Sequence, residues 1–185
     1  MVLATLLAGC GVNNIPTYEE QAKAAWSQVQ NQYQRRADLI PNLVETVKGA
    51  ANFERETLQA VIEARSKVAQ TTVPPDVLTN PEAFRGFEQN QAALTSALSR
   101  LLVVVERYPD LKANQNFLSL QSQLEGTENR IAVARRDYID AVRRYNTELR
   151  TFPGRLWAMT LYSGSEPMQN FTVAEDVSKA PTVKF

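Results

Sequence analysis

The chain has 185 residues, 44% of them hydrophobic and 22% charged, which suits one domain with a substantial core. Twenty basic residues balance twenty acidic ones, and this zero net charge argues against a nucleic-acid-binding protein. The chain contains no histidine and a single cysteine. These counts exclude Ser-His-Asp and Cys-His catalysis, histidine–metal chemistry, an internal disulfide and a cysteine-based zinc site.

The first residues are typical of a bacterial lipoprotein signal. Residues 1–9 are mostly apolar, far too short to span a bilayer, and end in small residues. Leu7-Ala8-Gly9-Cys10 resembles the lipobox, in which the cysteine is linked to diacylglycerol and becomes the first residue of the mature chain. We therefore predict residues 1–9 to be a signal remnant and Cys10 a lipidation site whose acyl chains, such as palmitate, anchor the protein.

Two further observations bear on this lipobox. The basic segment that usually opens such signals is absent, since the first basic residue is Lys23, so an incidental cysteine is the alternative. Gly11, and not aspartate, follows Cys10, which favours the outer membrane by resemblance to the sorting rule of enteric bacteria.

A tether over residues 10–16 is expected to lead into a helical stretch over residues 17–70. Thr17 fits an N-cap, with Glu20 completing a capping box. Apolar or small residues then recur at steps of three and four along one face. These are Ala22, Trp26, Val29, Tyr33, Ala37, Ile40, Val44, Val47, Ala51, Leu58, Val61 and Val68, with Arg65 on the same line.

Two residues interrupt this helical stretch. Pro41 lacks a backbone donor, and Gly49 disfavours a continuous helix. The stretch is therefore either one long helix with a kink, or two helices broken near 38–41 or near 49–52. The unbroken apolar stripe favours the kink.

Two more long helices are predicted, over residues 80–107 and 110–150. Asn80 fits an N-cap with Pro81 at the first helical position, and residues 101–105 are apolar on all sides, which favours a fully buried turn. The apolar faces comprise Phe84, Phe87, Gln91, Leu94, Leu98, Leu101 and Val105 in the first, and Leu111, Phe117, Leu120, Leu124, Ile131, Ala134, Tyr138, Ala141, Val142, Tyr145 and Leu149 in the second.

The chain after residue 153 is expected to be a C-terminal extension over residues 154–185. Residues 155–161 could make two helical turns, and residues 163–185 have no period and are expected to form an irregular tail. The sequence as a whole predicts an all-α fold, an elongated antiparallel up-and-down bundle of long helices.

Several strings resemble the LemA family of bacterial envelope proteins over roughly residues 17–153. They are RRADLIPNLVETVKG from Arg35, EARS from Glu63, YPDLKANQNF from Tyr108, LEGTENRIAVARR from Leu124 and YNT from Tyr145. The resemblance implies an elongated antiparallel helical bundle outside the cytoplasmic membrane, usually attached through an N-terminal transmembrane helix. This chain offers a lipobox instead, and it has Phe53 near the position where the family usually has a histidine.

Two polar clusters are candidates for partner binding or for structural pairing. Arg35, Arg36, Asp38 and Asn42 lie near Pro41, where arginine–carboxylate pairs could fix a bend or form a ligand site. The second cluster comprises Glu128, Asn129 and Arg130, beside Glu125. Paired carboxylates can bind divalent cations or act in acid–base catalysis. The structural interpretation is preferred, and we expect no catalytic residue, no metal and no cofactor.

The sequence thus favours a lipid-anchored envelope protein that acts by binding, without catalysis. The expected partners are the membrane, through lipid on Cys10, and an envelope protein or a second copy of the chain. A membrane-shaping scaffold is one alternative. A carboxylate-based enzyme with its site in a groove between helices is the other.

Overall fold

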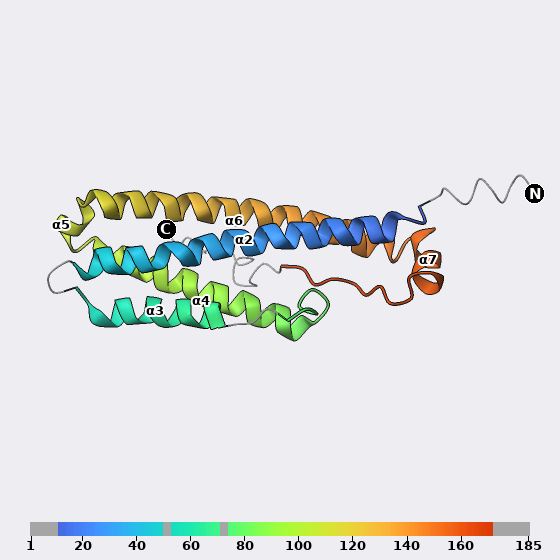
Figure 1. Cartoon of the computed structure of the whole chain (residues 1–185), viewed down its shortest axis with the longest axis horizontal. Coiled ribbons are helices and arrows are strands. Elements are labelled where there is room, and N and C mark those ends of the chain that lie inside the picture. Colours follow the sequence, from blue (N-terminus) through green and yellow to red (C-terminus); the bar gives the residue numbers. More distant parts are fainter. Residues whose placement is uncertain (1–10, 50–52, 71–73, 172–185) are drawn as a thin grey trace, which may run out of the picture.

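The computed structural model describes residues 11–49, 53–70 and 74–171. These residues form helices without strands, so the predicted all-α fold is confirmed (Figure 1). The helices are α2 (Asn14–Lys48), α3 (Arg55–Gln70), α4 (Pro81–Val105), α5 (Pro109–Lys112), α6 (Gln115–Glu148) and α7 (Gly154–Thr160).

The four longer helices run up and down along one elongated body (Figure 1). α2 and α6 lie side by side and antiparallel over most of their length, and α3 forms a hairpin with α4. At 1.5 Å per residue, the 35 residues of α2 extend about 52 Å, and the 16 residues of α3 about 24 Å. α5 lies at one end of the body, and α7 lies at the other end.

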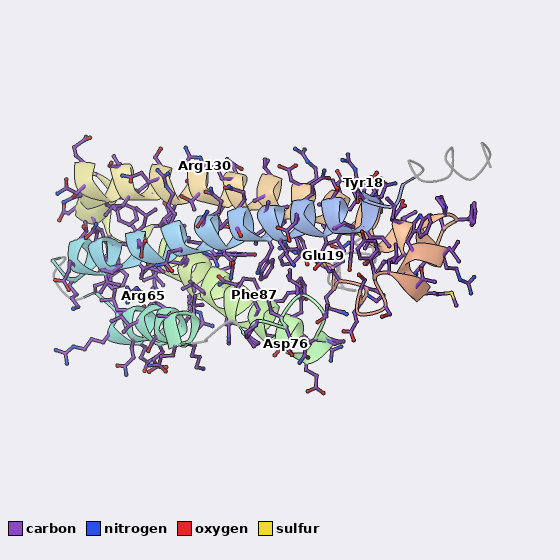
Figure 2. All side chains as sticks on the ribbon, turned by 45° about the vertical axis from the view of Figure 1, so that its right-hand side comes forward. Tyr18, Glu19, Arg65, Asp76, Phe87 and Arg130 are labelled. Atoms are coloured by element: carbon purple, nitrogen blue, oxygen red, sulfur yellow. The ribbon has the colours of Figure 1, made fainter. Side chains whose placement is uncertain are left out.

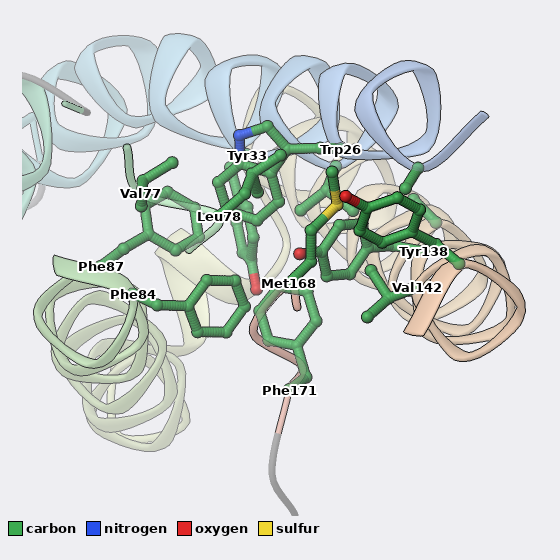
Figure 3. Close-up of a cluster of buried hydrophobic side chains, with 14 of the residues drawn as sticks. Trp26, Tyr33, Val77, Leu78, Phe84, Phe87, Tyr138, Val142, Met168 and Phe171 are labelled. Carbon is green, nitrogen blue, oxygen red and sulfur yellow. The ribbon is translucent and has the colours of Figure 1, made fainter. Parts of the chain in front are cut away.

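The core consists of two apolar clusters that follow one another along the long axis. The cluster nearer α7 is rich in aromatic rings, with Trp26 at its centre (Figure 3). The Trp26 ring lies 4.9 Å from Phe87, 5.3 Å from Tyr138 and 5.6 Å from Phe84, measured between centroids. The other cluster, nearer α5, is largely aliphatic. Almost all of the predicted stripe residues that the structure describes are buried in these two clusters, with Arg65, Val68 and Ala141 only partly buried.

Several helix boundaries differ from the predicted ones. α2 begins at Asn14, three residues before the predicted start at Thr17, and the Asn13 side chain at its N-cap makes no capping bond, so the predicted Thr17 cap is wrong. α2 continues through Pro41 and ends at Lys48, so the break lies near Gly49 and the favoured single kinked helix is wrong. The Asn80 cap is confirmed, because its side chain accepts from the Glu82 and Ala83 amides.

The predicted helix over 110–150 is divided into α5 and α6. Asn114 ends the turn between them, because its side chain accepts from the backbone amides of Asn116 and Phe117 and so caps α6. The predicted fully buried turn at 101–105 is wrong at two positions, since Leu102 is only partly buried and Val103 is exposed. Val103 is 71% exposed, since it lies on the side of α4 that faces away from the bundle.

Pro41 stays inside α2 because Arg65 replaces the hydrogen bond that proline cannot make. In a regular helix the amide of residue 41 would donate to the carbonyl of Ala37, and proline has no such amide. The Arg65 Nε–H of α3 donates to the Ala37 carbonyl oxygen instead, at 3.1 Å. This bond explains why an arginine occupies the apolar line of α3, half-buried against α2.

The segment after α7 covers the part of the core that the short α3 leaves open. Residues 163–171 contain no helix or strand beyond a turn, as predicted, but they do not form a detached tail. They run back along the bundle, with Met168 and Phe171 buried among the aromatic rings of the first cluster (Figures 1 and 3). Val77 and Leu78, in the loop before α4, fill the remainder of that side.

Hydrogen bonds hold this C-terminal segment in place. The Asn146 side chain of α6 donates to the Met168 carbonyl at 2.8 Å and accepts from the Met168 amide at 2.9 Å. Tyr138 donates its hydroxyl to the Gln169 carbonyl at 2.7 Å, and burial raises the pKa of Tyr138 well above its ordinary value. The Gln169 amide donates to the Leu78 carbonyl at 2.6 Å. Asn146 therefore acts as a backbone-like partner for a segment without regular structure.

We predict that the Arg65–Ala37 bond and Pro41 are energetically coupled. Arg65→Leu leaves a buried carbonyl unsatisfied, so the free energy of unfolding should fall by about 1–3 kcal/mol. In a Pro41→Ala background the new amide at position 41 satisfies Ala37, and the same substitution should cost markedly less. Urea unfolding of the four chains of this double-mutant cycle measures the coupling.

The control for this cycle is Arg55→Leu, which removes an exposed arginine from the same helix. Its effect should be small and equal in both backgrounds. Equal costs of Arg65→Leu with proline and with alanine at position 41 would contradict the assignment.

We also predict that Asn146→Ala loosens the C-terminal segment. Loss of both side-chain bonds to Met168 should destabilise the protein by about 1–3 kcal/mol and increase amide exchange over residues 163–171. Hydrogen exchange followed by mass spectrometry measures the amide exchange of the peptides that cover residues 163–171. Asn129→Ala, an exposed asparagine of the same helix, is the matched control. Unchanged protection of residues 163–171 in the Asn146 variant would refute the role.

Candidate functional site

A groove of about 610 Å³ lies between α4 and the α2–α6 pair. This size lies within the range of protein ligand sites. The groove is lined by Tyr33 and Arg36 of α2, by Arg85, Glu88, Gln89, Gln91, Ala92 and Thr95 of α4, by Glu128, Ile131, Arg135 and Ile139 of α6, and by Phe171. It contains three arginines and two glutamates, and it lies on the half of the bundle that α3 does not cover.

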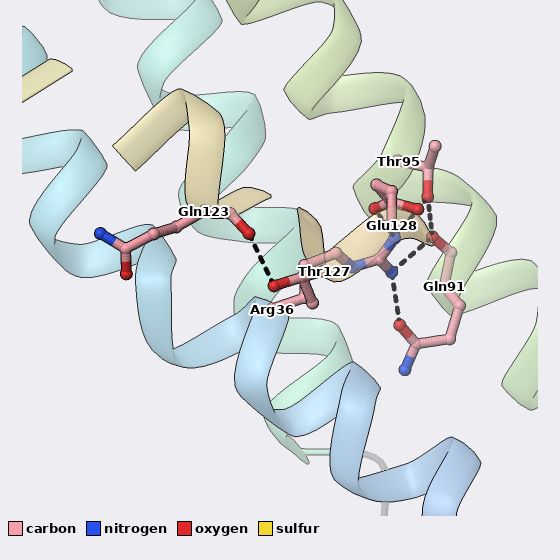
Figure 4. A network of polar contacts seen from close by, with 6 residues as sticks. All are labelled: Arg36, Gln91, Thr95, Gln123, Thr127 and Glu128. Carbon is pink, nitrogen blue, oxygen red and sulfur yellow. Dashed lines mark hydrogen bonds and ion pairs between the residues drawn. The ribbon is translucent and has the colours of Figure 1, made fainter. Parts of the chain in front are cut away.

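Arg36 forms the floor of the groove and joins three helices (Figure 4). Its side chain is 1% exposed. Nη1 donates to Glu128 Oε1 on α6 at 2.7 Å and to Thr95 Oγ1 on α4 at 2.7 Å. Nη2 donates to Gln91 Oε1 at 2.7 Å and to the Gln91 carbonyl at 3.3 Å. Four guanidinium donors are thus bonded, and Nε has no hydrogen-bond partner among the described residues.

The charge of Arg36 is balanced by only one carboxylate. Glu128 is 44% exposed on its side chain, so one member of the pair is buried while the other reaches the groove and solvent. Burying a charge is costly unless it is paired and hydrogen-bonded, and Gln91 and Thr95 supply the neutral acceptors that complete its solvation. The face of Tyr33 adds a cation–π contact, with its centroid 5.1 Å from the Arg36 Cζ.

The walls of the groove combine charge with apolar surface. Arg135 of α6 lies over the Phe171 ring, with Cζ 4.2 Å from the centroid. Burial raises the pKa of Tyr33, against the opposing effect of the nearby Arg135 and Arg36, so its hydroxyl stays protonated at neutral pH. Arg85 is exposed on α4. The groove therefore presents the cations of Arg85 and Arg135 above a floor in which all four terminal N–H groups of the Arg36 guanidinium are bonded.

The structure separates the polar residues that the sequence grouped together. It brings Arg36 and Glu128 into contact, although they come from different predicted clusters. Arg35 is exposed, and the exposed Asp38 accepts from Gln34 at 2.8 Å along the same helix, so neither takes part in the Arg36 network.

The remaining predicted residues lie on other surfaces. Asn129 and Arg130 are exposed and face a separate hollow of about 380 Å³ on another side of the α2–α6 pair, because each step along a helix turns the side chain by about 100°. Asn42 is also exposed, in a shallow hollow of about 420 Å³ near the start of α6.

Sequence reasoning missed most of the groove. Arg85, Glu88, Thr95 and Arg135 belong to polar helix faces that carry no pattern of their own. Gln91 did carry a signal, since it interrupts an otherwise apolar stripe, and a polar residue on such a stripe indicates a buried polar partner. Phe171 could not be found, because it follows α7 in a stretch without periodicity.

Two expectations concern features outside this groove. Cys10, the predicted lipidation site, lies outside the described residues. Within residues 11–49, 53–70 and 74–171, no helix combines the length and apolar character needed to cross a membrane. In those same ranges, no group of three or more cysteine, aspartate or glutamate side chains is arranged to hold a metal ion.

Comparison with known proteins gives one consistent family. The chain is 26% identical over 140 residues to a protein named LemA from Metamycoplasma hominis, a match covering 76% of this chain and 60% of the relative. It is 25% identical over 167 residues to each of two proteins named magnetosome protein MamQ 1 and MamQ 2 from Paramagnetospirillum magneticum, covering 82% of this chain and 61% of each relative.

The chain therefore spans about three fifths of the length of the curated relatives that it matches. The model of the LemA family matches residues 25–185, which include the groove, α7 and the C-terminal segment as well as most of the predicted bundle. With that match over most of its length and the helical bundle described above, the chain belongs to the LemA family.

Proposed function

We propose that the protein is a lipid-anchored binding module of the bacterial cell envelope, attached through Cys10, without catalytic activity. The groove carries this proposal: it is concave, mixed in charge, and built on rigid helices around a fully buried arginine. Membership of the LemA family and the lipobox sequence support a membrane-associated location. Gly11 after the cysteine favours the outer membrane.

The groove suits a protein partner better than a reacting substrate. The buried Arg36 already donates to Glu128, Gln91 and Thr95, so these donors hold the helices together and are not available to a substrate. Tyr33 keeps its proton at neutral pH, and the chain has no histidine to act as a general base. The exposed Arg85 and the partly buried Arg135 instead provide the charged rim, beside apolar side chains, that polypeptide interfaces commonly use.

A membrane-organising scaffold is a second candidate, supported by the likeness to two proteins named as magnetosome proteins. A scaffold of this kind should change the curvature of liposomes to which the purified lipidated protein is bound. The binding module should leave their curvature unchanged.

Lipid attachment predicts a specific change in the mature protein. Cys10→Ser removes the thiol that would carry diacylglycerol, so the variant should be released from the membrane fraction or remain unprocessed. Mass spectrometry of the mature N-terminus should show residues 1–9 removed and acyl chains on Cys10 in the unchanged protein. A mature chain without lipid on this residue would contradict the anchor.

The groove predicts position-dependent crosslinking in intact cells. A photoreactive amino acid at Gln89, inside the groove, should capture one partner or a second copy of the chain. The same group at Ser99, exposed on α4 outside the groove, should not. Arg85→Glu with Arg135→Glu should weaken the crosslink about tenfold. A partner that is complementary to the two arginines would be repelled by the two glutamates that replace them.

The charge-matched control for that pair is Arg100→Glu with Arg136→Glu, which reverses two exposed arginines that do not line the groove. This control should leave the crosslink intact. Equal capture from Gln89 and Ser99, or an equal loss in both double variants, would show that the groove is not the binding surface.

A further inference from the structure

Exposed apolar side chains gather at one end of the bundle. Eight large hydrophobic side chains are exposed in the described residues, and four of them fall within residues 152–161. Phe152 is 81% exposed, Met159 70%, Leu161 64% and Leu156 48%. We call these four side chains the apolar tip. Their grouping on and around α7 contrasts with single exposed apolar residues, which are normal on protein surfaces.

The residues around the apolar tip are basic and aromatic. Residues 149–165 contain Arg150 and Arg155, both exposed, and no aspartate or glutamate. Trp157 and Tyr162 are partly buried beside them and pack against the aromatic cluster of the core. Apolar side chains mixed with arginine, tryptophan and tyrosine are the composition of protein surfaces that enter the headgroup region of an anionic membrane.

The apolar tip is mounted firmly on the bundle. The start of α7 approaches the end of α6 so closely that a Cβ on Gly154 would lie 2.3 Å from the Glu148 carbonyl oxygen. The Glu148 side chain in turn accepts from Asn14 Nδ2 at 3.1 Å, which ties the end of α6 to the start of α2. The four side chains are therefore presented by a fixed part of the fold.

The N-terminal end of the described chain lies beside this tip. Gly11 adopts φ +76° in the turn before α2, and a Cβ on it would lie 3.6 Å from Pro153 Cγ. Cys10 is bonded directly to Gly11, and adjacent Cα atoms are about 3.8 Å apart. The start of α2, near the labelled Tyr18, lies at the α7 end of the body (Figures 1 and 2). By chain connectivity, any lipid carried on Cys10 is attached at that end.

We propose that the apolar tip inserts into the headgroup region of the membrane as a second contact beside the lipid anchor. This orientation rests on the proposed acylation of Cys10, whereas the affinity of the tip for lipid does not. Two contacts at one end would hold the bundle upright, because a single flexible anchor would leave its tilt free. A second copy fits the tip less well, since Arg150 and Arg155 would then face the same arginines of the partner.

The two tryptophans of the chain allow a direct test, since Trp157 lies in α7 and Trp26 is buried in the core. Full-length protein, both acylated and carrying Cys10→Ser, is mixed with phosphatidylethanolamine–phosphatidylglycerol vesicles containing brominated lipid. Trp26→Phe leaves Trp157 as the reporter, and Trp157→Phe leaves Trp26. Circular dichroism confirms that each variant is folded.

The proposal expects quenching of Trp157 and not of Trp26. Met159→Asp with Leu161→Asp should abolish the quenching of Trp157 and reduce vesicle binding of the Cys10→Ser chain about tenfold, since aspartate removes apolar contact and is repelled by anionic headgroups. Val103→Asp, which changes an apolar residue 71% exposed near the α5 end, should leave both unchanged.

The outcomes separate the tip from the anchor. Quenching of Trp157 in the Cys10→Ser chain supports the tip and leaves the anchor untouched, whereas mass spectrometry that finds no lipid on an intact Cys10 counts against the anchor alone. An acylated chain whose Trp157 is unquenched, or is quenched equally in the double aspartate variant, overturns the tip. Self-association that is lost with Met159→Asp and Leu161→Asp, without lipid quenching, assigns the surface to a second copy and also overturns it.

Discussion

The guanidinium of Arg36 bonds to α4 and α6 at one level of the bundle, and the rest of the packing is arranged about that level. On α2 the aromatic cluster ends at Tyr33 and the aliphatic cluster begins at Ile40. On α4 the same change falls between Phe87 and Leu94, around Gln91, and on α6 between Leu124 and Ile131, around Thr127. Of the four buried polar residues described, three lie in this layer: Arg36, Gln91 and Thr127.

A polar layer of this kind constrains the register of the helices. Sliding α4 or α6 by one turn would move an apolar side chain opposite the Arg36 charge and leave its donors unsatisfied. Such a slip is strongly unfavourable in a medium of low dielectric constant. Apolar stripes alone allow several registers at similar energy, so one buried charge with partners on two neighbouring helices supplies a specificity that hydrophobic contacts do not.

The short α3 explains both the groove and the packed C-terminal segment. α3 covers the aliphatic cluster, and its Arg65 donates to the carbonyl that Pro41 leaves without a helical partner. The helix ends before the aromatic cluster. That half of the bundle needs another cover, which residues 163–171 and the loop before α4 provide. Phe171, the last described residue of that segment, also lines the groove.

How far the sequence predicted this structure follows from the same physics. Apolar periodicity identified the long helices and nearly all of their buried faces, because burial of a stripe is a local property of each helix. It did not show that α2 ends near Gly49, since an apolar stripe can continue in phase across a break. It also missed the packing of Met168 and Phe171, which depends on backbone bonds to Asn146 and on no repeating pattern.

The groove was only partly predictable, for a related reason. Arg36 and Glu128 were both singled out as polar residues, but their contact joins residues 92 positions apart, and no pattern in a single sequence fixes which faces of α2 and α6 meet. Arg35 and Asp38, the neighbours that looked equally promising, lie on exposed faces. The interruption of an apolar stripe by Gln91 was the one observation that pointed from the sequence to the network.

The location of the groove along the body limits what it could reach in the proposed orientation. Arg36 lies 22 residues after the start of α2, which places the groove floor about 33 Å along the helix from the anchored end. A bundle standing on the apolar tip would hold the groove beyond lipid headgroups, which extend only a few ångströms past the hydrocarbon. A partner bound there must therefore project well away from the membrane, as a folded domain does. A short loop of an integral membrane protein would not reach it, so the combination of tip and groove favours envelope proteins with sizeable extramembrane domains.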